Sequence, residues 1–386
     1  MHILMLTYNR AGIGGGYLRA WSLARSLARS GHQVSLFAGR AKAGFSPIRT
    51  IQDNVALFQS ADIFPRRWRH GGLSPLDALG RLIQIRKKKY DIVYGFDHRP
   101  AVALPALLRL GGLFISDWAD LWGPPGLATE VNGAFRRILG RWDGRFEKKL
   151  RLRADGVTAI SRYLGLQARE LGIPEERIQI IPVGANNEWI RPLPAMAMRK
   201  KYELPLDEPV AVYNGFVDHD AGLLAESLAL LTKKEPRLVL AYTGRRLASI
   251  EQAMAGPGNV SQVHYLGILP YPSLAEVLAC GDVMLMPMSR RSVNLARMPN
   301  RFGDYLAAGK PVVVTDVGDL AGIVRSEKIG RVSDADPLSF ADSVLELLAE
   351  PAARREMGQR ARHLAETRYS WDTLAGQLED FFKKFL

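Results

Sequence analysis

Arg301 and Asp304 stand three residues apart in the stretch 298–318, MPNRFGDYLAAGKPVVVTDVG, just before a wholly apolar strand pattern. Side chains three apart on a helix share one face. A helix that begins at Pro299 directs its first backbone amides toward an anion. Arg301 can then neutralise a diphosphate, and Asp304 can accept hydrogen bonds from a ribose diol. The alternative is an ion pair between Arg301 and Asp304 on a solvated helix face.

Three consecutive glycines, Gly14, Gly15 and Gly16, separate the strand pattern HILMLTY from the helix pattern YLRAWSLARSLARSG. Without side chains they let an anion approach the backbone at the helix N-terminus. A tight structural turn explains the same residues equally well. The cluster lacks the G-x-G-x-x-G spacing, so the sequence gives no support for a nicotinamide cofactor.

Strand patterns alternate with helix patterns through both halves of the chain, which is typical of parallel sheets covered on both faces. Residues 184–209 are rich in proline and polar residues and are the best candidate linker. We therefore predict an α/β protein with two doubly wound, Rossmann-like domains, 1–190 and 191–370, facing a central cleft. Ligands bind such sheets at the carboxyl ends of their strands. A C-terminal helix, 371–386, can cross back to the first domain.

The excess of positive charge is confined to the first half. Residues 1–190 hold 28 Lys and Arg against 15 Asp and Glu, whereas residues 191–386 hold 24 of each, so the whole net charge of +13 lies in residues 1–190. This asymmetry indicates different partners for the two halves. An anionic membrane surface or an anionic acceptor is one candidate partner of the first half, and nucleic acid is the rival.

Five segments resemble glycosyltransferase family 4 in their order along the chain: GGGYLRAWSLARSLARSGHQV, ADGVTAISRYL, IQIIPVGAN, VHYLGILPYPSLAEVLACGDVMLMP and PNRFGDYLAAGKPVVVTDVGD. The resemblance implies a GT-B fold, a nucleotide-sugar donor bound by residues 191–370, an acceptor bound by residues 1–190, and transfer that retains anomeric configuration. Arg301 stands where the family has lysine, and Asp304 where it has the ribose-binding glutamate. Gly15 and Gly16 match its donor-phosphate loop. The remaining predicted donor-binding residues are Gly14, Gly215, Phe216, Arg245, Leu269, Asn294, Arg297, Pro299 and Asn300.

Three departures from the family pattern alter the predicted donor site. Ala296 stands eight residues before Asp304, where the family often has a first acidic residue, and Asp304 is itself shorter than glutamate. Phe216 and Ala221 occupy the places of the Arg and Lys that usually clamp the diphosphate. Without a metal ion, cationic side chains must stabilise the leaving diphosphate. We therefore look to three arginines, which suit bidentate phosphate contact: Arg301, Arg297 and Arg245. For Arg245 and its neighbour Arg246, an exposed loop pair is the alternative.

Two loops that follow strand patterns of the first half, 95–100 (GFDHRP) and 116–126 (SDWADLWGPPG), concentrate acidic and aromatic residues. A carboxylate there can orient or deprotonate an acceptor hydroxyl, helped by a neutral histidine, and a tryptophan offers a flat face to a sugar ring. With Arg301, the predicted catalytic residues are Asp117, Asp120 and His98; the predicted acceptor-binding residues are Arg99, Trp118 and Trp122. The alternative is a helix capped by Asp117 with both tryptophans in the core.

Three basic stretches of the first half interleave cations with apolar residues: 65–69, 86–89 and 136–153. This composition suits docking on a membrane surface, although a solvated helix face explains each stretch by itself. No apolar run reaches about 18 residues, so we expect no membrane span. The single cysteine, Cys280, allows no disulfide within the chain and suits a reducing cytosol. We expect a cytoplasmic protein that binds the inner face of the membrane peripherally.

The resemblance therefore implies a glycosyltransferase that needs no metal. Consistent with this expectation, no cluster of His, Cys or carboxylates in the sequence has metal-ligand spacing. The expected partners are a nucleotide-sugar donor and a lipid-linked or cell-surface glycan acceptor. A GT-B nucleotide-sugar epimerase or hydrolase is the enzyme alternative. A basic nucleic-acid-binding protein is the other alternative, although its only support is the isoelectric point near 9.9.

Overall fold

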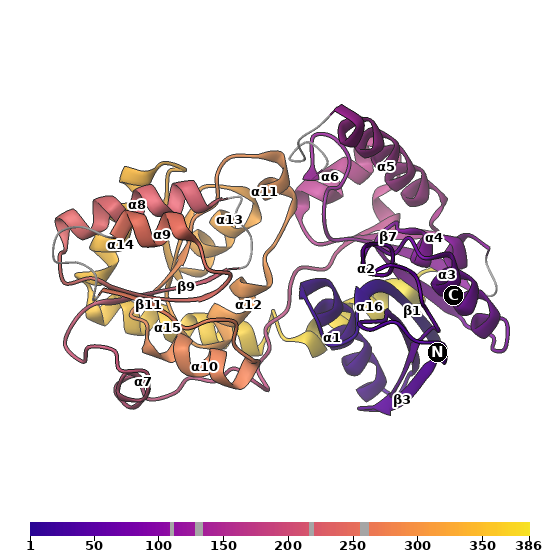
Figure 1. Ribbon diagram of the computed structural model, residues 1–386, viewed down its shortest axis with the longest axis horizontal. Helices are drawn as coiled ribbons and strands as arrows, with labels where there is room; N and C mark the ends of the chain where they lie inside the picture. The colour runs from indigo at the N-terminus through magenta and orange to yellow at the C-terminus, as the bar shows by residue number, and fades with distance from the viewer. Residues whose placement is uncertain (109–111, 128–133, 216–219, 255–261) are drawn as a thin grey trace. The chain divides into compact units, whose positions relative to one another are not determined.

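The computed structural model describes residues 1–108, 112–127, 134–215, 220–254 and 262–386, with the side chains of 134–139 left out (Figure 1). The chain forms two compact units. The first consists of residues 1–182 and 371–386, and the second of residues 183–370. Each unit is a largely parallel sheet with helices packed against it, as the alternation of strand and helix patterns predicts.

The first unit is built on an eight-stranded sheet in the order β3-β4-β2-β1-β5-β6-β7-β8. Its strands are β1 (His2–Arg10), β2 (Gln33–Gly39), β3 (Ile48–Gln52), β4 (Val55–Gln59), β5 (Ile92–Phe96), β6 (Leu113–Trp118), β7 (Gly156–Ala159) and β8 (Ile178–Ile180). All neighbouring strands pair in parallel except β3 and β4. The direction of winding reverses between β1 and β5, and such a switch point is where open α/β sheets bind ligands.

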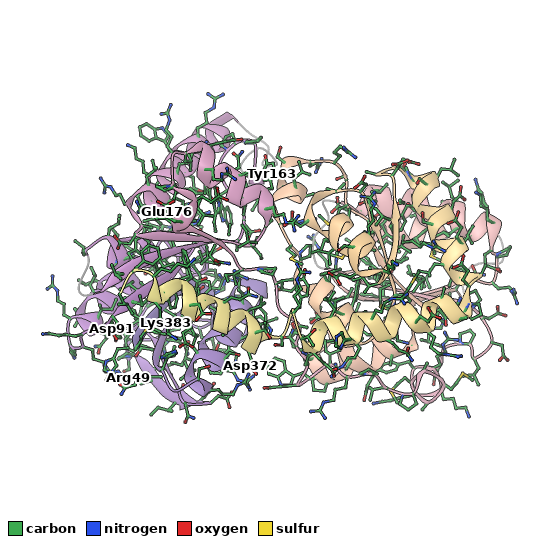
Figure 2. The ribbon with its side chains drawn as sticks, turned by 180° about the vertical axis from the view of Figure 1, so that it is seen from behind. Arg49, Asp91, Tyr163, Glu176, Asp372 and Lys383 are labelled. Atoms are coloured by element: carbon green, nitrogen blue, oxygen red, sulfur yellow. The ribbon has the colours of Figure 1, made fainter. Side chains whose placement is uncertain are left out.

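The helices of the first unit include a segment from the far end of the chain. They are α1 (Gly15–Arg29), α2 (Arg66–His70), α3 (Pro75–Ile85), α4 (Pro100–Leu107), α5 (Ala134–Arg153), α6 (Arg162–Glu170) and α16 (Trp371–Lys383). Asp372, near the start of α16, accepts a hydrogen bond of 2.6 Å from Arg29 of α1, and Phe382 packs edge-on against Tyr94 of β5. Figure 2 labels Asp372 and Lys383 at the two ends of α16.

The second unit has a six-stranded parallel sheet in the order β11-β10-β9-β12-β13-β14. The strands are β9 (Val210–Gly215), β10 (Val239–Gly244), β11 (Val263–Tyr265), β12 (Val283–Met286), β13 (Val312–Thr315) and β14 (Gly330–Ser333). Its helices are α7 (Ala195–Lys201), α8 (Ala221–Lys234), α9 (Ala248–Met254), α10 (Tyr271–Cys280), α11 (Ser292–Ala296), α12 (Asn300–Ala307), α13 (Gly318–Glu327), α14 (Pro337–Leu348) and α15 (Pro351–Glu366). The switch point of this sheet lies between β9 and β12.

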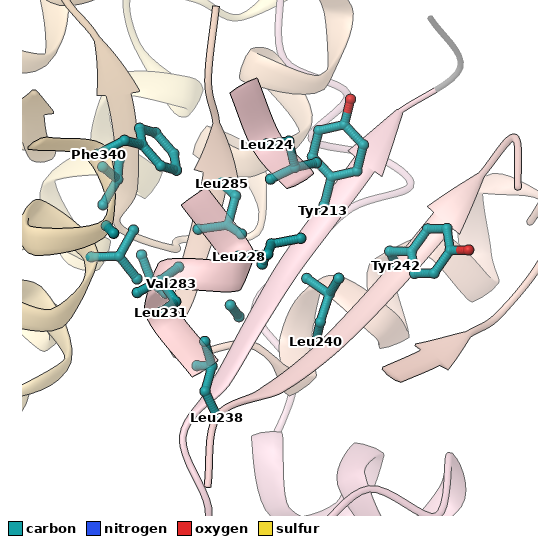
Figure 3. Packing of buried hydrophobic residues seen from close by; sticks show 14 of the residues in the cluster. Tyr213, Leu224, Leu228, Leu231, Leu238, Leu240, Tyr242, Val283, Leu285 and Phe340 are labelled. Atoms are coloured by element: carbon teal, nitrogen blue, oxygen red, sulfur yellow. The ribbon is translucent and has the colours of Figure 1, made fainter. Parts of the chain in front are cut away.

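An apolar cluster packs the helices α8, α9 and α14 against the central strands of the second unit (Figure 3). Leu224, Leu228 and Leu231 recur on one face of α8 and pack on buried side chains of β9, β10 and β12. Phe340 adds the face of α14. Burial of these side chains makes the central strands rigid. The carboxyl ends of those strands carry the site described below.

The boundary between the units lies at residue 182, rather than at residue 190 as drawn from the sequence. Residues 183–190 belong to the second unit because their polar groups are satisfied there. The Ala185 backbone N–H donates to the Tyr369 carbonyl at 2.7 Å, and the Asn186 side chain donates to Asp304 at 3.0 Å. In the described part of the chain, no helix combines the length and the apolar composition needed to cross a membrane.

Candidate functional site

Arg301 lies at the carboxyl end of β9, beside the switch point of the second sheet. Its Nη1 donates to the Tyr213 hydroxyl at 3.1 Å and to the Asn214 carbonyl at 3.2 Å. The guanidinium carbon lies 5.0 Å from the centre of the Tyr213 ring. Its Nε is buried and has no hydrogen-bond partner among the described residues. Arg301 is therefore held in place by two contacts and keeps a donor for a ligand.

Gly215 makes this arrangement possible. A Cβ on Gly215 would lie 2.5 Å from the ring and hydroxyl of Tyr213, so any other residue would displace the ring that supports Arg301. The Gly215 carbonyl accepts a hydrogen bond of 3.0 Å from the Arg245 backbone, which brings the end of β10 beside the end of β9. Arg245 is exposed there. Its neighbour Arg246 is also exposed and forms a surface ion pair of 2.6 Å with Glu251.

A second cation at the switch point, Arg297, is held by a buried carboxylate. Asp220 directly precedes α8, and its Oδ2 lies 2.6 Å from Arg297 Nη2. Its Oδ1 accepts hydrogen bonds from the Ser289 hydroxyl at 2.7 Å and from Asn294 Nδ2 at 2.8 Å. Asn294 is thus buried in the network that fixes Arg297. Because Asp220 offsets part of its charge, Arg297 is a weaker source of positive potential than Arg301.

Asp304 takes partners different from those of Arg301, and the two residues form no ion pair among the described residues. The Asp304 carboxylate is buried, and Asn186 Nδ2 donates to its Oδ1 at 3.0 Å. Asn186 also contacts the hydroxyl of Tyr271 at 3.2 Å. Burial raises the pKa of Asp304 from 3.8 to about 7, against the opposing hydrogen bond from Asn186. The alternative of a solvated Arg301–Asp304 ion pair is wrong.

The other predicted donor residues fall at or near the strand ends of the second unit. Pro299 occupies the N-cap position of α12, and Asn300 is its first helical residue, as expected for a helix that begins at Pro299. Leu269 is partly buried in the loop after β11. Phe216 lies outside the described residues, and Ala221 is the first residue of α8.

The glycine cluster begins α1 in the first unit. Gly14 is the N-cap residue with a φ of 85°, a conformation that favours glycine, and Gly15 and Gly16 form the first turn. Gly14 and Gly15 are exposed. The structure is compatible both with a tight turn and with an anion at the amides of this turn.

Asp117 is a structural residue, which corrects its prediction as a catalytic carboxylate. It lies within β6 and is fully buried. Arg19 of α1 donates to both carboxylate oxygens at 2.9 Å, and Tyr94 and Thr158 donate to Oδ1 at 2.9 and 2.7 Å. With every bond inside the protein, Asp117 neither caps a helix nor reaches a substrate.

His98 is buried between two carboxylates, which corrects its prediction as a neutral catalytic helper. Its Nδ1 lies 2.7 Å from Asp97 and its Nε2 lies 2.9 Å from Asp143 of α5. Burial favours the neutral ring, but the hydrogen bonds to Asp143 and Asp97 outweigh it and raise the pKa of His98 from 6.5 to about 9. His98 is therefore a cation at neutral pH, and neither ring nitrogen is available to a substrate.

The two tryptophans differ in their environment. Trp118 is fully buried and its Nε1 donates to Glu147 at 2.9 Å, so it belongs to the core and not to an acceptor site. Trp122 is only partly buried, and the Arg99 guanidinium covers one face at 4.5 Å from the ring centre. Arg99 also donates to Asp143 at 3.1 Å. Of the predicted acceptor residues, Arg99 and Trp122 thus lie together.

Asp120 is the predicted carboxylate that remains exposed. Asp120 lies close to Tyr8, near the end of β1. Burial raises the pKa of the Tyr8 phenol, and the negative charges of Asp97 and Asp120 raise it further. This arrangement brings the ends of β1, β5 and β6 together at one edge of the first sheet, across its switch point.

Two domain profiles match most of the chain. A profile described as "Glycosyl transferase 4-like domain" matches residues 14–184, and one described as "Glycosyl transferases group 1" matches residues 208–350. The chain belongs to glycosyltransferase family 4. Members of this family are sugar-transferring enzymes, and the predicted resemblance is confirmed.

Curated relatives carry names of the same kind. A D-inositol 3-phosphate glycosyltransferase of Thermobispora bispora is 28% identical over 57% of this chain, and the match spans only 54% of that relative. A D-inositol 3-phosphate glycosyltransferase of Xylanimonas cellulosilytica is 26% identical over 96% of this chain and 91% of its own length. A GDP-mannose-dependent alpha-(1-6)-phosphatidylinositol monomannoside mannosyltransferase of Mycobacterium tuberculosis is 27% identical over 59% of this chain and 62% of its own.

Solved structures show the GT-B fold. The sucrose-phosphate synthase of Thermosynechococcus elongatus aligns with a TM-score of 0.78 at 18% identity, over 99% of this chain and 98% of its own. WaaG, a glycosyltransferase involved in lipopolysaccharide biosynthesis, aligns with a TM-score of 0.73 at 18% identity, over 98% and 99%. At these identities the likeness shows the fold alone.

Sequence reasoning missed several residues of this family 4 protein's candidate sites. Asp143 and Glu147 are the only acidic residues in the basic stretch 136–153 and stand four apart, which indicates one inward helix face. Asp97 directly follows β5 and precedes His98, so the sequence itself indicates a carboxylate beside this histidine. Nothing in the sequence marks the roles of Tyr213, Asp220 and Asn186, because their partners are distant along the chain.

Proposed function

We propose that this protein transfers a sugar from a nucleotide-diphosphate sugar to an acceptor, with retention of anomeric configuration and without a metal ion. The observation that carries the proposal is the placement of Arg301 at the end of β9. Tyr213 and Asn214 fix Arg301, and its buried Nε–H has no hydrogen-bond partner among the described residues. An arginine held in this way suits contact with a diphosphate at the switch point.

The chemistry assigned to the second unit is stabilisation of the leaving group. Negative charge grows on the diphosphate as the glycosidic bond breaks, and a preorganised cation stabilises that charge without reorganisation. Arg301 supplies most of the positive potential, and Arg297 adds to it while Asp220 holds its orientation. Asp304 and Asn186 bind the ribose. The ribose hydroxyls donate hydrogen bonds to the Asp304 carboxylate and so replace part of the hydration that this group loses on burial.

The first unit takes the acceptor in this proposal. Asp120, exposed after β6, orients the acceptor hydroxyl, and Trp122 with Arg99 lines the acceptor site. A lipid-linked or cell-surface glycan is the proposed acceptor class. Support comes from the relative named as a phosphatidylinositol monomannoside mannosyltransferase.

We also propose that the protein works in the cytoplasm at the inner face of an anionic membrane. The support is the charge of +13 that the sequence confines to residues 1–190, since a basic surface is attracted to anionic lipid. This location would bring the first unit to a lipid-linked acceptor.

A donor panel tests the proposed function. Titration calorimetry with uridine, guanosine and adenosine diphosphate sugars should show binding of at least one, and turnover should require an acceptor. Arg301→Ala should abolish most turnover, whereas Arg246→Ala, which removes a surface ion pair with Glu251 and a contact with the Tyr265 ring, should leave it intact. Binding of none of the panel would contradict the proposal, and conversion of the donor without any acceptor would indicate an epimerase or hydrolase instead.

A further inference from the structure

One helix of the first unit exposes an apolar stripe. Leu76, Leu79 and Ile83 recur at helical spacing along α3, and all three are exposed, as is Leu73 just before the helix. The opposite face of α3 is buried through Ala78 and Ile85. A surface helix typically turns charged and polar residues toward water, and a contiguous exposed apolar stripe marks an interaction site.

Within residues 63–89 the stripe is accompanied by exposed cations and by no exposed acid, and the next acid along the chain is the exposed Asp91. Six exposed residues within 63–89 are positively charged: Arg66, Arg67, Arg86, Lys87, Lys88 and Lys89. None of the six forms an ion pair with any residue that the structure describes. The single acidic residue of 63–89, Asp77, is buried and bound to Arg81 at 2.9 Å. We call residues 63–89 the α3 surface.

We propose that the α3 surface docks on an anionic lipid bilayer, with Leu76, Leu79 and Ile83 entering the headgroup region and the flanking cations contacting lipid phosphates. This inference rests on the membrane association proposed above and names the surface that performs it. Bilayers favour this combination because aliphatic side chains gain by leaving water while cations gain from the negative surface potential. Nucleic acid would use the cations but would leave the aliphatic stripe in water.

Another basic helix provides a comparison. On α5, Arg141, Arg145 and Lys149 are exposed beside Trp142. The inner face of α5, however, carries Asp143 toward the site described above, so this helix already has a role there. If general electrostatic attraction explained membrane binding, removing these three charges would act as strongly as removing three charges from the α3 surface.

Matched variants of the full-length protein test the proposal by sedimentation with vesicles of phosphatidylcholine alone or with one-third phosphatidylserine. The stripe variant is Leu79→Ser with Ile83→Ser, at positions 54% and 48% exposed. Its control is Leu166→Ser with Leu338→Ser, at positions 53% and 51% exposed on α6 and α14. The charge variant is Lys87→Gln, Lys88→Gln and Lys89→Gln, and its control is Arg141→Gln, Arg145→Gln and Lys149→Gln.

The wild type should bind the anionic vesicles, and the stripe and charge variants should each bind at least tenfold more weakly, while both controls stay within threefold of the wild type. Nucleotide-sugar affinity should be unchanged in all four. Equal losses in the α5 control, or wild-type binding by the stripe variant, would overturn the assignment to the α3 surface while leaving membrane association standing. No vesicle binding by the wild type would overturn both membrane claims but not the proposed sugar transfer. Self-association of the wild type that the stripe variant loses would show that a second copy covers the stripe.

Discussion

Asp117 and Asp304 are both buried carboxylates, but their partners differ. Asp117 receives hydrogen bonds from Arg19, Tyr94 and Thr158. Asp304 has the Asn186 amide and no cation among the described residues. A buried carboxylate without a cation is costly when ionised. Asp304 therefore has unused capacity to accept hydrogen bonds, which is consistent with the ribose role proposed for it.

Asp304→Asn should change the pH dependence of stability. The folded pKa of about 7 lies above the ordinary 3.8, so the wild type is stabilised by protonation at low pH and loses that stability as pH rises through 7. The loss relative to Asp304→Asn should reach about 1.4 kcal/mol per pH unit at most. Urea unfolding between pH 4 and 8 measures it.

Asp304→Asn should also bind nucleotide about 1–3 kcal/mol more weakly, because ribose hydroxyls lose an acceptor.

Asp316→Asn is the control for the pH dependence of stability. Arg325 lowers the pKa of the exposed Asp316 carboxyl, so the pH trend of this variant should not resemble that of Asp304→Asn. A constant stability difference from pH 4 to 8 would show that Asp304 is ionised throughout.

His98→Gln should destabilise the protein most at low pH. The folded pKa of about 9 exceeds the ordinary 6.5, so the stabilisation by Asp97 and Asp143 is complete below pH 6.5 and is lost as pH rises through 9. The gap in unfolding free energy between wild type and variant should therefore shrink from pH 6 to pH 9.5. A gap that widens over this range would mean that His98 is neutral in the fold.

At the scale of elements, the Arg19–Asp117 pair joins α1 to β6. Arg19 also donates to the Ile181 carbonyl at 2.8 Å, so one buried side chain ties three segments of the first unit. Breaking a buried ion pair by removing one partner leaves an uncompensated charge. These two residues therefore hold the strand ends on which the acceptor loops stand.

Asp117→Ala should cost about 3–5 kcal/mol of unfolding free energy. Asp120→Asn, on the exposed loop two residues beyond β6, should leave stability unchanged while lowering turnover. Chemical denaturation and initial rates of both variants make the comparison. Wild-type stability of Asp117→Ala would contradict the structural role assigned here, and full activity of Asp120→Asn would remove that residue from the acceptor site.

The elements were far more readable from sequence than the contacts between them. Apolar patterns predicted most strands of both sheets and placed a helix directly after Pro299, because that signal is local, but they did not mark β3, β4 or β14. Asp117 was predicted in a loop, yet β6 continues through Trp118, because the buried Asp117 carboxylate is paired with Arg19, which lies 98 residues away along the chain. Asp97 adopts a φ of 85°, which no local pattern announces. One of the two carboxylate partners of His98, Asp143, comes from α5, 45 residues away.

At the scale of the whole molecule, the alternation of strands and helices was sufficient to predict two doubly wound domains, and the resemblance of five segments to glycosyltransferase family 4 was sufficient to predict the family and its GT-B fold. The fold of α16 onto the first unit follows from its stripe of Leu374, Leu378, Phe381 and Phe382, which are all buried. The boundary at residue 182 could not be read, because proline content marks irregular backbone and does not show which unit satisfies its hydrogen bonds.

The central claim is that Arg301 stabilises the leaving diphosphate from the carboxyl end of β9. The most direct measurement is kcat/KM of Arg301→Ala with its best donor, with circular dichroism as the folding control and Arg246→Ala as the matched arginine variant. Removing one preorganised donor costs about 2–4 kcal/mol of transition-state stabilisation, so kcat/KM should fall roughly 30- to 1,000-fold. A folded Arg301→Ala protein with wild-type kcat/KM would contradict this account.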